Sequence, residues 1–417
     1  MMALISLAAL GLAIFLGFVK KMNTGLLCMA LAFVTGRMAG ISDAEIVSGF
    51  NSSLFVMLLG VTYLFGLAEI NGTLSLLSKK IVALSGRRTF LVPIVMYVFA
   101  TILSALGPGT IPTTAIMMVF GMTLAVEMNI NPAMLAAIIF LGAAGGGMSP
   151  LAATGIIGLN LCGEFGLTGI EEPLLLNGIL SSTVYASLVY LFFGGYRLKS
   201  ETALRLTDIP SFKRYQLVTL TGILCMVVLV LLFQVNVGLA SFAVAAVLSF
   251  LHVSDETEAI RRIPWGTLLL ICGVGVLMNV IIRTGGIDLL SDELAAVMND
   301  STAVSILGIT AGVLSWFSST SGVVMPTLIP TVPHIISEIG STANPVEWVT
   351  AISMVSNTAG ISPLSTGGAL ALAAYSAEKG IEKGEVEWLF SRMFFISVAG
   401  VISLSALAYF GLYRWLL

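Results

Sequence analysis

The sequence predicts an all-α integral membrane protein with two inverted repeats, each of five transmembrane helices plus one re-entrant hairpin. Three observations predict this fold class. Of 417 residues, 57% are hydrophobic and only 10% are charged. A soluble protein of this length needs more charged residues to cover its water-exposed surface. Short motifs recur at one constant displacement along the chain, and the basic residues gather on one side of the membrane when the apolar segments are counted as crossings.

At roughly 20 apolar residues per crossing, ten segments are expected to span the membrane. They lie near 2–19, 24–40, 52–70, 132–162, 174–194, 215–233, 237–252, 265–283, 346–375 and 393–414. Two further apolar stretches, 89–126 and 302–337, are too long for one crossing. The first is interrupted by Gly107-Pro108-Gly109 and the second by Ser318-Ser319-Thr320-Ser321-Gly322. We interpret each as a hairpin that enters and leaves the membrane on the same side.

The repeat is visible at the positions where a membrane helix would have to break. Gly147-Met148-Ser149-Pro150-Leu151 recurs as Gly360-Ile361-Ser362-Pro363-Leu364 (360 − 147 = 213). Interrupted hydrophobic segments at matching positions in two halves indicate the binding site of a secondary transporter. Because each half has an odd number of crossings, the halves must have opposite orientations. The sequence therefore predicts a first repeat at 1–196, a cytoplasmic linker at 197–214 and a second repeat at 215–417.

Positive charge tests this topology, because cytoplasmic loops hold most of the Lys and Arg residues. Of the 19 basic residues, 16 fall on one side. They are Lys20, Lys21, Lys79, Lys80, Arg87, Arg88, Arg197, Lys199, Arg205, Lys213, Arg214, Arg261, Arg262, Lys379, Lys383 and Arg392. Arg37, Arg283 and Arg414 fall opposite. We expect a multi-pass protein of the cell (inner) membrane, with both termini outside and the linker cytoplasmic.

An amphipathic segment precedes each predicted hairpin. Apolar residues at helical spacing alternate there with polar residues, as in a helix that lies in the membrane interface. The apolar residues are Leu74, Leu77, Ile81 and Leu84 in the first half, and Ile287, Leu290, Leu294 and Val297 in the second. These segments are either ordinary connecting helices or arms that link a fixed scaffold to a moving transport domain.

The predicted breaks carry the chemistry. Serine is a favoured N-cap and proline is tolerated at the first helical position, so Ser149-Pro150 and Ser362-Pro363 are each expected to begin a half-helix. The returning helices of the hairpins are expected to begin at Thr110 and Ser321. Four helix N-termini would then converge on an anion with free N–H groups and partial positive charge. The expected substrate-binding residues are Thr110, Thr113, Ser149, Pro150, Ser319, Thr320, Ser321, Ser362 and Pro363.

No Lys or Arg lies in the hairpins or broken helices, so the charge of a dianion must be met by helix ends, hydroxyls and co-bound cations. Carbonyl, hydroxyl and amide oxygens bind hard cations, and sodium is the expected coupling ion. The expected ligands are Gly107, Gly109, Gly145, Gly146, Ser318, Ser356, Asn357 and Thr358. His334 follows Ser321 by 13 residues, roughly 20 Å along a helix, and we interpret it as an interfacial residue rather than a proton relay. Any one small residue also suits close helix packing.

Three segments resemble a known family. Gly60-Val61-Thr62-Tyr63-Leu64-Phe65, Asn71-Gly72-Thr73 and the sequence GAAGGGMSP at 142–150 resemble the malonate (dicarboxylate) carrier, or MatC-like, family of the ion-transporter superfamily, which includes the divalent anion:sodium symporters. The resemblance implies a dimeric, elevator-type carrier that holds a small carboxylate with sodium ions at its hairpin tips and broken helices. The symporters carry Ser-Asn-Thr at both tips, whereas this chain has Pro108-Gly109-Thr110 and Ser319-Thr320-Ser321. Ser356-Asn357-Thr358 belongs to the second broken helix.

The predicted function is secondary active transport of small dicarboxylates, with malonate or C4 acids as substrates and sodium as the coupling ion. The expected partners are the substrate, the lipid bilayer and a second copy of the chain, and no nucleic acid. A proton-coupled carrier or exchanger of another small anion on the same fold, or an anion channel, remains an alternative. No His-Glu-x-x-His motif or pair of membrane aspartates indicates an intramembrane enzyme, so we do not expect catalysis.

Overall fold

The computed structural model describes residues 1–417 apart from 84–87, 200–208, 379–380, 415 and 417. The described residues form helices joined by short turns, and none of them belongs to a β-strand. The helices of the first half are α1 (Met2–Lys20), α2 (Thr24–Met38), α3 (Asp43–Val47), α4 (Ser52–Ile70), α5 (Thr73–Ala83), α6 (Val92–Ala105), α7 (Thr110–Glu127), α8 (Pro132–Gly146), α9 (Ala153–Glu164) and α10 (Glu171–Phe192).

The second half repeats this order. Its helices are α11 (Arg214–Phe233), α12 (Val237–Phe250), α13 (Glu256–Arg262), α14 (Trp265–Arg283), α15 (Gly286–Ala295), α16 (Ala303–Phe317), the π-helical turn η4 (Thr320–Val324), α17 (Met325–Leu328), the 3-10 turn η5 (Ile329–Thr331), α18 (Val332–Glu338), α19 (Pro345–Ala359), α20 (Thr366–Ser376) and α21 (Lys383–Tyr409). The segment from η4 to α18 occupies the place that α7 has in the first half.

Repeated asparagines begin matching helices. The Asn23 side chain accepts a hydrogen bond from Gly25 N (2.9 Å), and the Asn236 side chain accepts one from Gly238 N (3.0 Å). The Asn131 and Asn344 side chains cap α8 and α19 in the same way, each before a proline at the first helical position. Asparagine satisfies an N–H group that has no partner inside the helix, so these residues define where the matching helices start.

Matching helices also make matching contacts. Helix α2 packs on α14, and α12 packs on α4. A Cβ on Gly60 would overlap Gly238 O, and a Cβ on Gly273 would overlap Gly25 O. Gly238 and Gly273 are the counterparts of Gly25 and Gly60, so the contact is reciprocal between the halves. Small residues let two membrane helices approach this closely.

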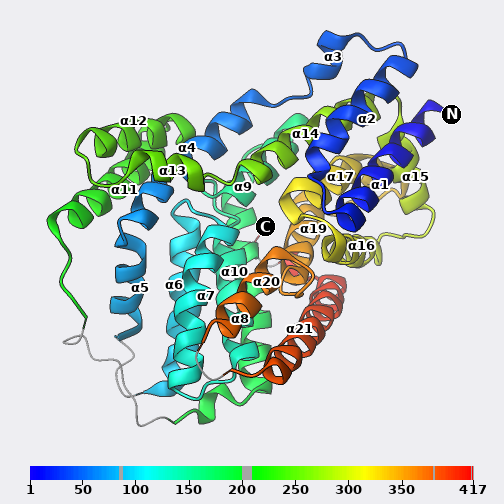
Figure 1. The fold of residues 1–417 in the computed structure, drawn as a ribbon. Coiled ribbons are helices and arrows are strands. Elements are labelled where there is room, and N and C mark those ends of the chain that lie inside the picture. Colours follow the sequence, from blue (N-terminus) through cyan, green and yellow to red (C-terminus); the bar gives the residue numbers. More distant parts are fainter. Residues whose placement is uncertain (84–87, 200–208, 379–380, 415, 417) are drawn as a thin grey trace.

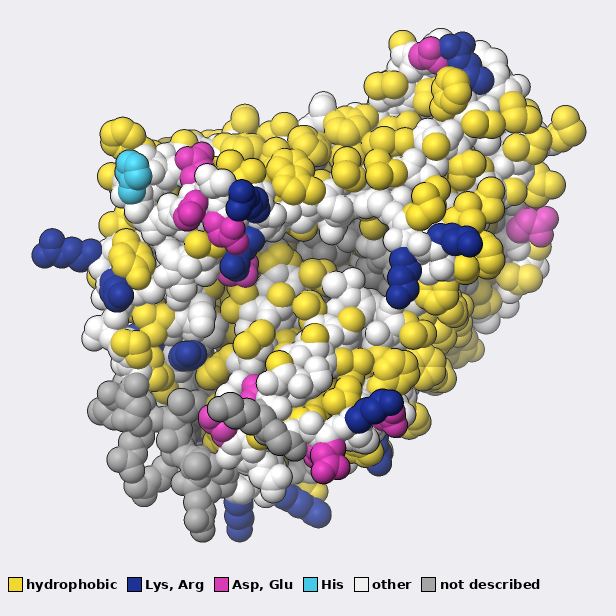
Figure 2. Space-filling view, in the orientation of Figure 1, with side chains coloured by type: hydrophobic (Ala, Val, Ile, Leu, Met, Phe, Trp, Pro, Cys, Tyr) yellow, Lys and Arg dark blue, Asp and Glu magenta, His cyan; other side chains and the backbone are white. Residues whose placement is uncertain are grey.

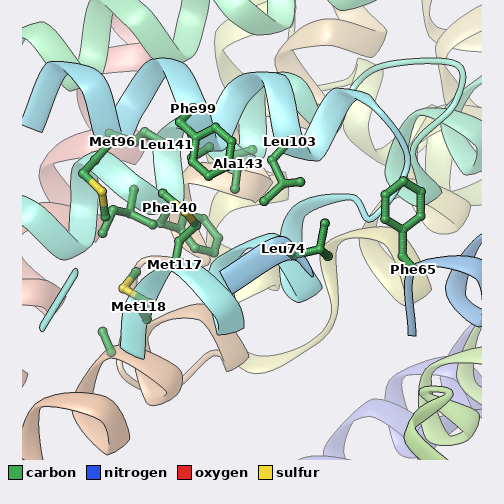
Figure 3. Packing of buried hydrophobic residues seen from close by; sticks show 14 of the residues in the cluster. Phe65, Leu74, Met96, Phe99, Leu103, Met117, Met118, Phe140, Leu141 and Ala143 are labelled. Atoms are coloured by element: carbon green, nitrogen blue, oxygen red, sulfur yellow. The ribbon is translucent and has the colours of Figure 1, made fainter. Parts of the chain in front are cut away.

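Figure 1 shows where these pairs lie. Helices α11, α12 and α13 lie with α4 on one side, at the upper left, and α1 and α2 lie with α14 on the other side. Helices α6, α7, α8 and α10 form a bundle below and between them. The main hydrophobic core joins α6, α7 and α8, and Figure 3 shows Phe99 and Leu103 of α6 packed near Phe140 of α8.

The described helices suit a membrane. Six are long and apolar enough to cross one, namely those in Met2–Lys20, Asp43–Ile70, Thr110–Glu127, Glu171–Phe192, Trp265–Arg283 and Lys383–Tyr409. Hydrophobic side chains also cover much of the outer face in Figure 2. The pair α16 and Thr320–Glu338 would make a seventh span, but it is bent by 120° at its break. Helices α8 and α19 have 15 residues each, about 22 Å of helix, which is shorter than the hydrocarbon core.

The start of one predicted helix differs from the structure. Helix α21 begins at Lys383 rather than near 393, because its first turns carry Glu and Arg residues that form helix well but interrupt an apolar count. The short helices α3 and α13 were not expected, and the side chains of Ser42 and Asp255 cap them. Leu84, Arg87, Arg205, Lys379 and the linker segment 200–208 lie outside the described residues.

Candidate functional site

Both broken helices turn at the repeated Ser-Pro pair. Helix α8 ends at Gly146 and α9 begins at Ala153, while α19 ends at Ala359 and α20 begins at Thr366. The prediction that Ser149 and Ser362 cap the half-helices was wrong. Ala152 and Ser365 occupy the N-cap positions. The serines stabilise the turn instead.

In these turns each serine oxygen accepts the amide two residues later. Ser149 Oγ accepts from Leu151 N and Ser362 Oγ from Leu364 N, both at 3.2 Å. The turn between α8 and α9 brings the start of α9 back against the end of α8, where Gly155 N donates to Gly147 O (2.8 Å).

The same closure occurs in the second half, where Gly368 N donates to Gly360 O (3.2 Å). A Cβ on Gly155 would overlap Ser149 O, and a Cβ on Gly368 would overlap Ser362 O. Gly155 and Gly368 are separated by the same displacement as the two Ser-Pro pairs. Each therefore allows the half-helix to start directly behind its turn, and a larger side chain has no room.

Each hairpin tip is fixed to a broken helix by two hydroxyls. Ala143 O accepts from Ser104 Oγ (2.7 Å) and from Thr110 Oγ1 (3.4 Å). Ser356 O, the equivalent atom of the second half, accepts from the hydroxyls of Ser315 (2.7 Å) and Thr320 (3.0 Å). The two tips are therefore attached at matching carbonyls.

The first tip directs the start of α7 toward α9. Helix α7 begins at Thr110, as expected, and Gly109 caps it with a φ of 77°, in the left-handed region that glycine adopts without a steric cost. A Cβ on Gly109 would lie 3.3 Å from Ala153 N. This tip therefore lies in front of the N-terminus of α9.

The second tip begins its returning segment at Thr320, not at Ser321 as expected. Ser319 is the N-cap, and its Oγ accepts from Gly322 N (3.1 Å). The sequence offers four hydroxyl residues in a row here, from 318 to 321. The backbone conformation, which is extended at Ser319, selects the one that caps.

A cavity of about 270 Å³ lies where these four N-termini meet. Its lining comes from the first turns of α7, α9, α20 and the returning segment, from α8 and α19, and from α14. The lining residues are Thr110, Ile111, Phe140, Thr154, Thr267, Leu270, Phe317, Ser318, Ser319, Thr320, Ser321, Asn357, Gly360, Leu364, Ser365 and Thr366. None of these described residues is charged.

The helix starts at this cavity leave amide N–H groups free. Among the described residues, no hydrogen-bond acceptor is found for Ala153 N and Thr154 N of α9, or for Thr366 N and Gly367 N of α20. Such groups cannot stay unsatisfied away from water. Together with the partial positive charge of a helix N-terminus, they favour an anion.

The hydroxyls divide into donors and acceptors. Thr110 and Thr320 already donate to carbonyls, and Ser318 Oγ donates to Leu314 O (2.7 Å). Their oxygens can only accept further bonds, which suits a cation. Ser319 Oγ accepts, so its O–H remains free to donate to an anion.

Asn357 adds an acceptor at the cavity. Its Nδ2 donates to Ser353 O (3.0 Å), and no donor among the described residues is bound to its Oδ1. An amide oxygen is a common ligand of hard cations. The cavity therefore presents donors for an anion beside acceptors for a cation.

The first part of the chain matches a known family model. Residues 1–147 match the family model for the N-terminus of the dicarboxylate carrier protein MatC. This confirms the resemblance inferred from the sequence motifs over that part of the chain. Comparison with curated proteins found no match.

Two solved structures share the fold. The YdaH transporter of Alcanivorax borkumensis has a TM-score of 0.60 at 15% identity, covering 90% of this chain and 88% of its own. MtrF of Neisseria gonorrhoeae, described among antimetabolite efflux pumps, has a TM-score of 0.57 at 16% identity, covering 88% of this chain and 82% of its own. The described residues are thus all helical, as in a multi-pass membrane protein, and they share the fold of these two proteins. The matched family model and the printed descriptions of both structures concern a carrier, a transporter and efflux pumps rather than enzymes.

Six of the predicted site residues line the cavity of this carrier-like chain: Thr110, Ser318, Ser319, Thr320, Ser321 and Asn357. Thr113 lies one turn further along α7, fully buried, with its hydroxyl unpartnered among the described atoms. Ser149, Pro150, Ser362 and Pro363 lie in the turns behind the half-helices, outside the cavity lining. They shape the site rather than line it.

Five of the expected sodium ligands lie at helix contacts. A Cβ on Gly145 would overlap Ser182 of α10, one on Gly146 would overlap Thr101 O of α6, and one on Gly107 would overlap the Phe65 ring. Ser356 Oγ bonds to its own helix at Ile352 O (2.6 Å).

Thr358 is the fifth, and its side chain faces α21. A Cβ on Gly400 would lie 2.5 Å from Thr358 Cγ2, and Thr358 Oγ1 donates to Met354 O (2.8 Å). None of these five expected ligands is among the residues that line the cavity. Gly109, the remaining glycine, stays at the tip in front of α9.

The sequence reasoning missed Thr154, Ser365 and Thr366. The repeated glycines Gly155 and Gly368, which lie beside them, were the signal available in the sequence. Phe140 was also missed, because only the structure brings it from α8 to the second break, where a Cβ on Gly360 would lie 2.7 Å from its ring.

Proposed function

We propose that the protein is a secondary active transporter that moves a small dicarboxylate, malonate or a C4 acid, together with sodium. The observation that carries this proposal is the uncharged cavity at which four helix N-termini meet. The matched carrier family and the transporter fold support it. A volume of about 270 Å³ is below the range of drug-sized pockets and suits a small carboxylate.

The charges of the site match those of the cargo. A helix N-terminus acts as roughly half a positive charge, so four of them present about two, which equals the charge of a dicarboxylate. The partial charges of the helix ends alone do not compensate for the water that the dicarboxylate and the cavity lose on binding. The acceptor oxygens of Thr110, Thr320 and Asn357 beside the anion donors give a sodium ion a place to bind. Sodium would then neutralise the dianion during the crossing.

The arrangement of the halves supports alternating access. A contact in which Gly60 meets Gly238 and Gly25 meets Gly273 is reciprocal, and reciprocal contacts arise from a twofold relation. With the five crossings predicted for each half, such an axis would lie in the membrane plane and invert one half relative to the other. We propose that α5 and α15 are the arms of an elevator-type carrier, and that the chain works as a homodimer.

The proposed inversion of the two halves predicts on which side of the membrane each loop lies. A cysteine at Lys213 is expected to be shielded from an impermeant thiol reagent in intact cells, and one at Glu171 to be labelled, because basic residues remain cytoplasmic. The background should carry Cys225→Ser, since Cys225 is the exposed one of the four cysteines. Permeabilised cells, in which both positions should react, provide the control. Labelling at Lys213 alone would reverse the orientation of both halves.

Uptake into proteoliposomes tests the function itself. Labelled malonate and C4 dicarboxylates should accumulate with an inward sodium gradient and fall to background without sodium at fixed pH. Sodium should tighten substrate binding by the same factor as substrate tightens sodium binding. Full uptake driven by a pH gradient in sodium-free buffer would instead show a proton-coupled carrier. Flux that never exceeds the electrochemical equilibrium of the anion would show a channel.

A further inference from the structure

We propose a binding site for a divalent transition metal ion such as Zn²⁺, formed by Asp292 of α15 with His334 and Glu338 of α18. His334 Nε2 lies 2.8 Å from Asp292 Oδ1. One ligand atom from each of the three residues lies within 4.8 Å of the other two. Two helices that are far apart in sequence therefore bring three metal-ligating groups to one place.

Helical spacing directs these groups to one another. His334 and Glu338 are four residues apart on α18, so both lie on the same face of that helix. Asp288 and Asp292 have the same spacing on α15, and the two helices are in contact. A pair of ligands at this spacing on one helix face is a known way to hold zinc.

Asp288 lies on the Nδ1 side of the His334 ring. Its Oδ1 lies 3.8 Å from His334 Nδ1, whereas Asp292 meets the other ring nitrogen. A histidine that binds a metal through one nitrogen almost always donates its other N–H to a carboxylate, which orients the ring. Nε2 of His334 lies next to Asp292, and Asp288 is the carboxylate on the Nδ1 side, at a distance longer than a hydrogen bond. Asp288 is therefore placed to take the orienting role when a metal binds through Nε2.

The charge and the ligand types select the metal. Three carboxylates around one imidazole keep a net negative charge even when the histidine is protonated, and a divalent cation neutralises it. One imidazole nitrogen with two carboxylate oxygens suits Zn²⁺ and its transition-metal neighbours, whereas Ca²⁺ and Mg²⁺ prefer oxygen alone. The His334 side chain is 36% exposed, so an ion from solution has access.

The first half has no equivalent site. The counterparts of Asp292, His334 and Glu338 in that half are Lys79, Gly121 and Ala125. The site therefore belongs to one end of the molecule and is expected once per chain. It is also separate from the cavity, because none of its residues lines it.

The position of the site gives the metal an effect on transport, an inference that rests on the proposed function. The metal would join α15, a proposed arm, to α18 of the second hairpin. A bridge between them would restrain the hairpin relative to the arm. Zn²⁺ added to the side of the membrane that holds His334 is therefore expected to slow uptake at least tenfold in the wild type and not in His334→Gln.

Metal binding is tested on purified full-length protein that carries Cys225→Ser. We expect one Zn²⁺ per chain by titration calorimetry, and a Co²⁺ absorption band that Zn²⁺ removes. His334→Gln and Asp292→Asn should each lower the affinity at least tenfold. Asp288→Asn should lower it by about ten- to a hundredfold with the stoichiometry unchanged. His252→Gln, which changes the only other histidine of the chain, should bind as the wild type does.

Two results would overturn the site. One is the absence of saturable Zn²⁺ binding by the wild type up to millimolar concentration. The other is an affinity that His334→Gln leaves unchanged. Because calorimetry does not depend on transport, a protein that binds zinc but moves no dicarboxylate would disprove the proposed function and leave the metal site standing.

Discussion

Replacing Asn357 by aspartate is expected to lower the affinity for a dicarboxylate several hundredfold while the protein still folds. The change keeps the shape of the side chain and adds a negative charge to a cavity whose described lining carries none. Two unit charges 4 Å apart interact with about 4 kcal/mol at an effective dielectric constant of 20, and every 1.4 kcal/mol is a factor of ten. Binding to detergent-solubilised protein and uptake by proteoliposomes both measure the effect.

A matched control is available on α9. Asn160 Nδ2 donates to Ile156 O (2.8 Å), four residues earlier in its helix. Asn357 Nδ2 makes the same type of bond to Ser353 O. Asn160, however, does not line the cavity. Asn160→Asp should therefore change dicarboxylate affinity less than threefold. Because burial disfavours a charged carboxylate, part of the loss in Asn357→Asp should reverse as the pH is lowered. Equal losses in both variants would place the substrate elsewhere.

Alanine at Gly155 or Gly368 is expected to abolish transport. Each Cβ would overlap the carbonyl of the serine in the turn behind it, so the half-helix has to move. Forcing extra atoms into a packed site costs roughly 1–3 kcal/mol, and the movement would displace the free N–H groups from the cavity. We expect uptake to fall at least a hundredfold and the melting temperature of the purified protein to decrease.

Gly163→Ala is the control. Gly163 lies on the same helix as Gly155, and a Cβ at Gly163 would have no neighbouring atom within 4 Å. This substitution should leave uptake unchanged and slightly stabilise α9, since alanine favours a helix more than glycine does. If Gly155→Ala and Gly368→Ala both bind substrate with wild-type affinity, substrate binding does not depend on the present positions of α9 and α20. The anion would then be bound by other groups.

Sequence periodicity and the repeat were enough to predict the helical architecture. The apolar runs correspond to helices because the hydrocarbon core demands satisfied backbone groups along each span. The constant displacement between the repeated motifs predicted where the breaks occur, since Gly147-to-Leu151 and Gly360-to-Leu364 cannot continue a regular helix. The first hairpin also begins its return at Thr110 as expected, because Gly109 adopts a conformation that ends one helix before the next.

The details of the site depended on three-dimensional contacts. Ser149 is a good N-cap by type, yet Gly155 draws α9 back onto α8 and moves the start of the helix past the Ser-Pro turn. Asn357 and Thr358 are neighbours with similar oxygens, but α21 covers Thr358 while Asn357 lines the cavity. A sequence does not show which face of a buried helix meets a neighbour when every face is apolar.

The amino-acid sequence by itself thus determined the membrane environment, the repeat and the positions of the breaks, because each follows from local composition and chain length. Tertiary structure decided which oxygens and N–H groups meet at one cavity. It also brought His334 to Asp292, 42 residues away, where the sequence had indicated only an interfacial histidine. Such convergence depends on how α15 packs against α18, and packing between helices is set by side chains from the whole fold rather than by either helix alone.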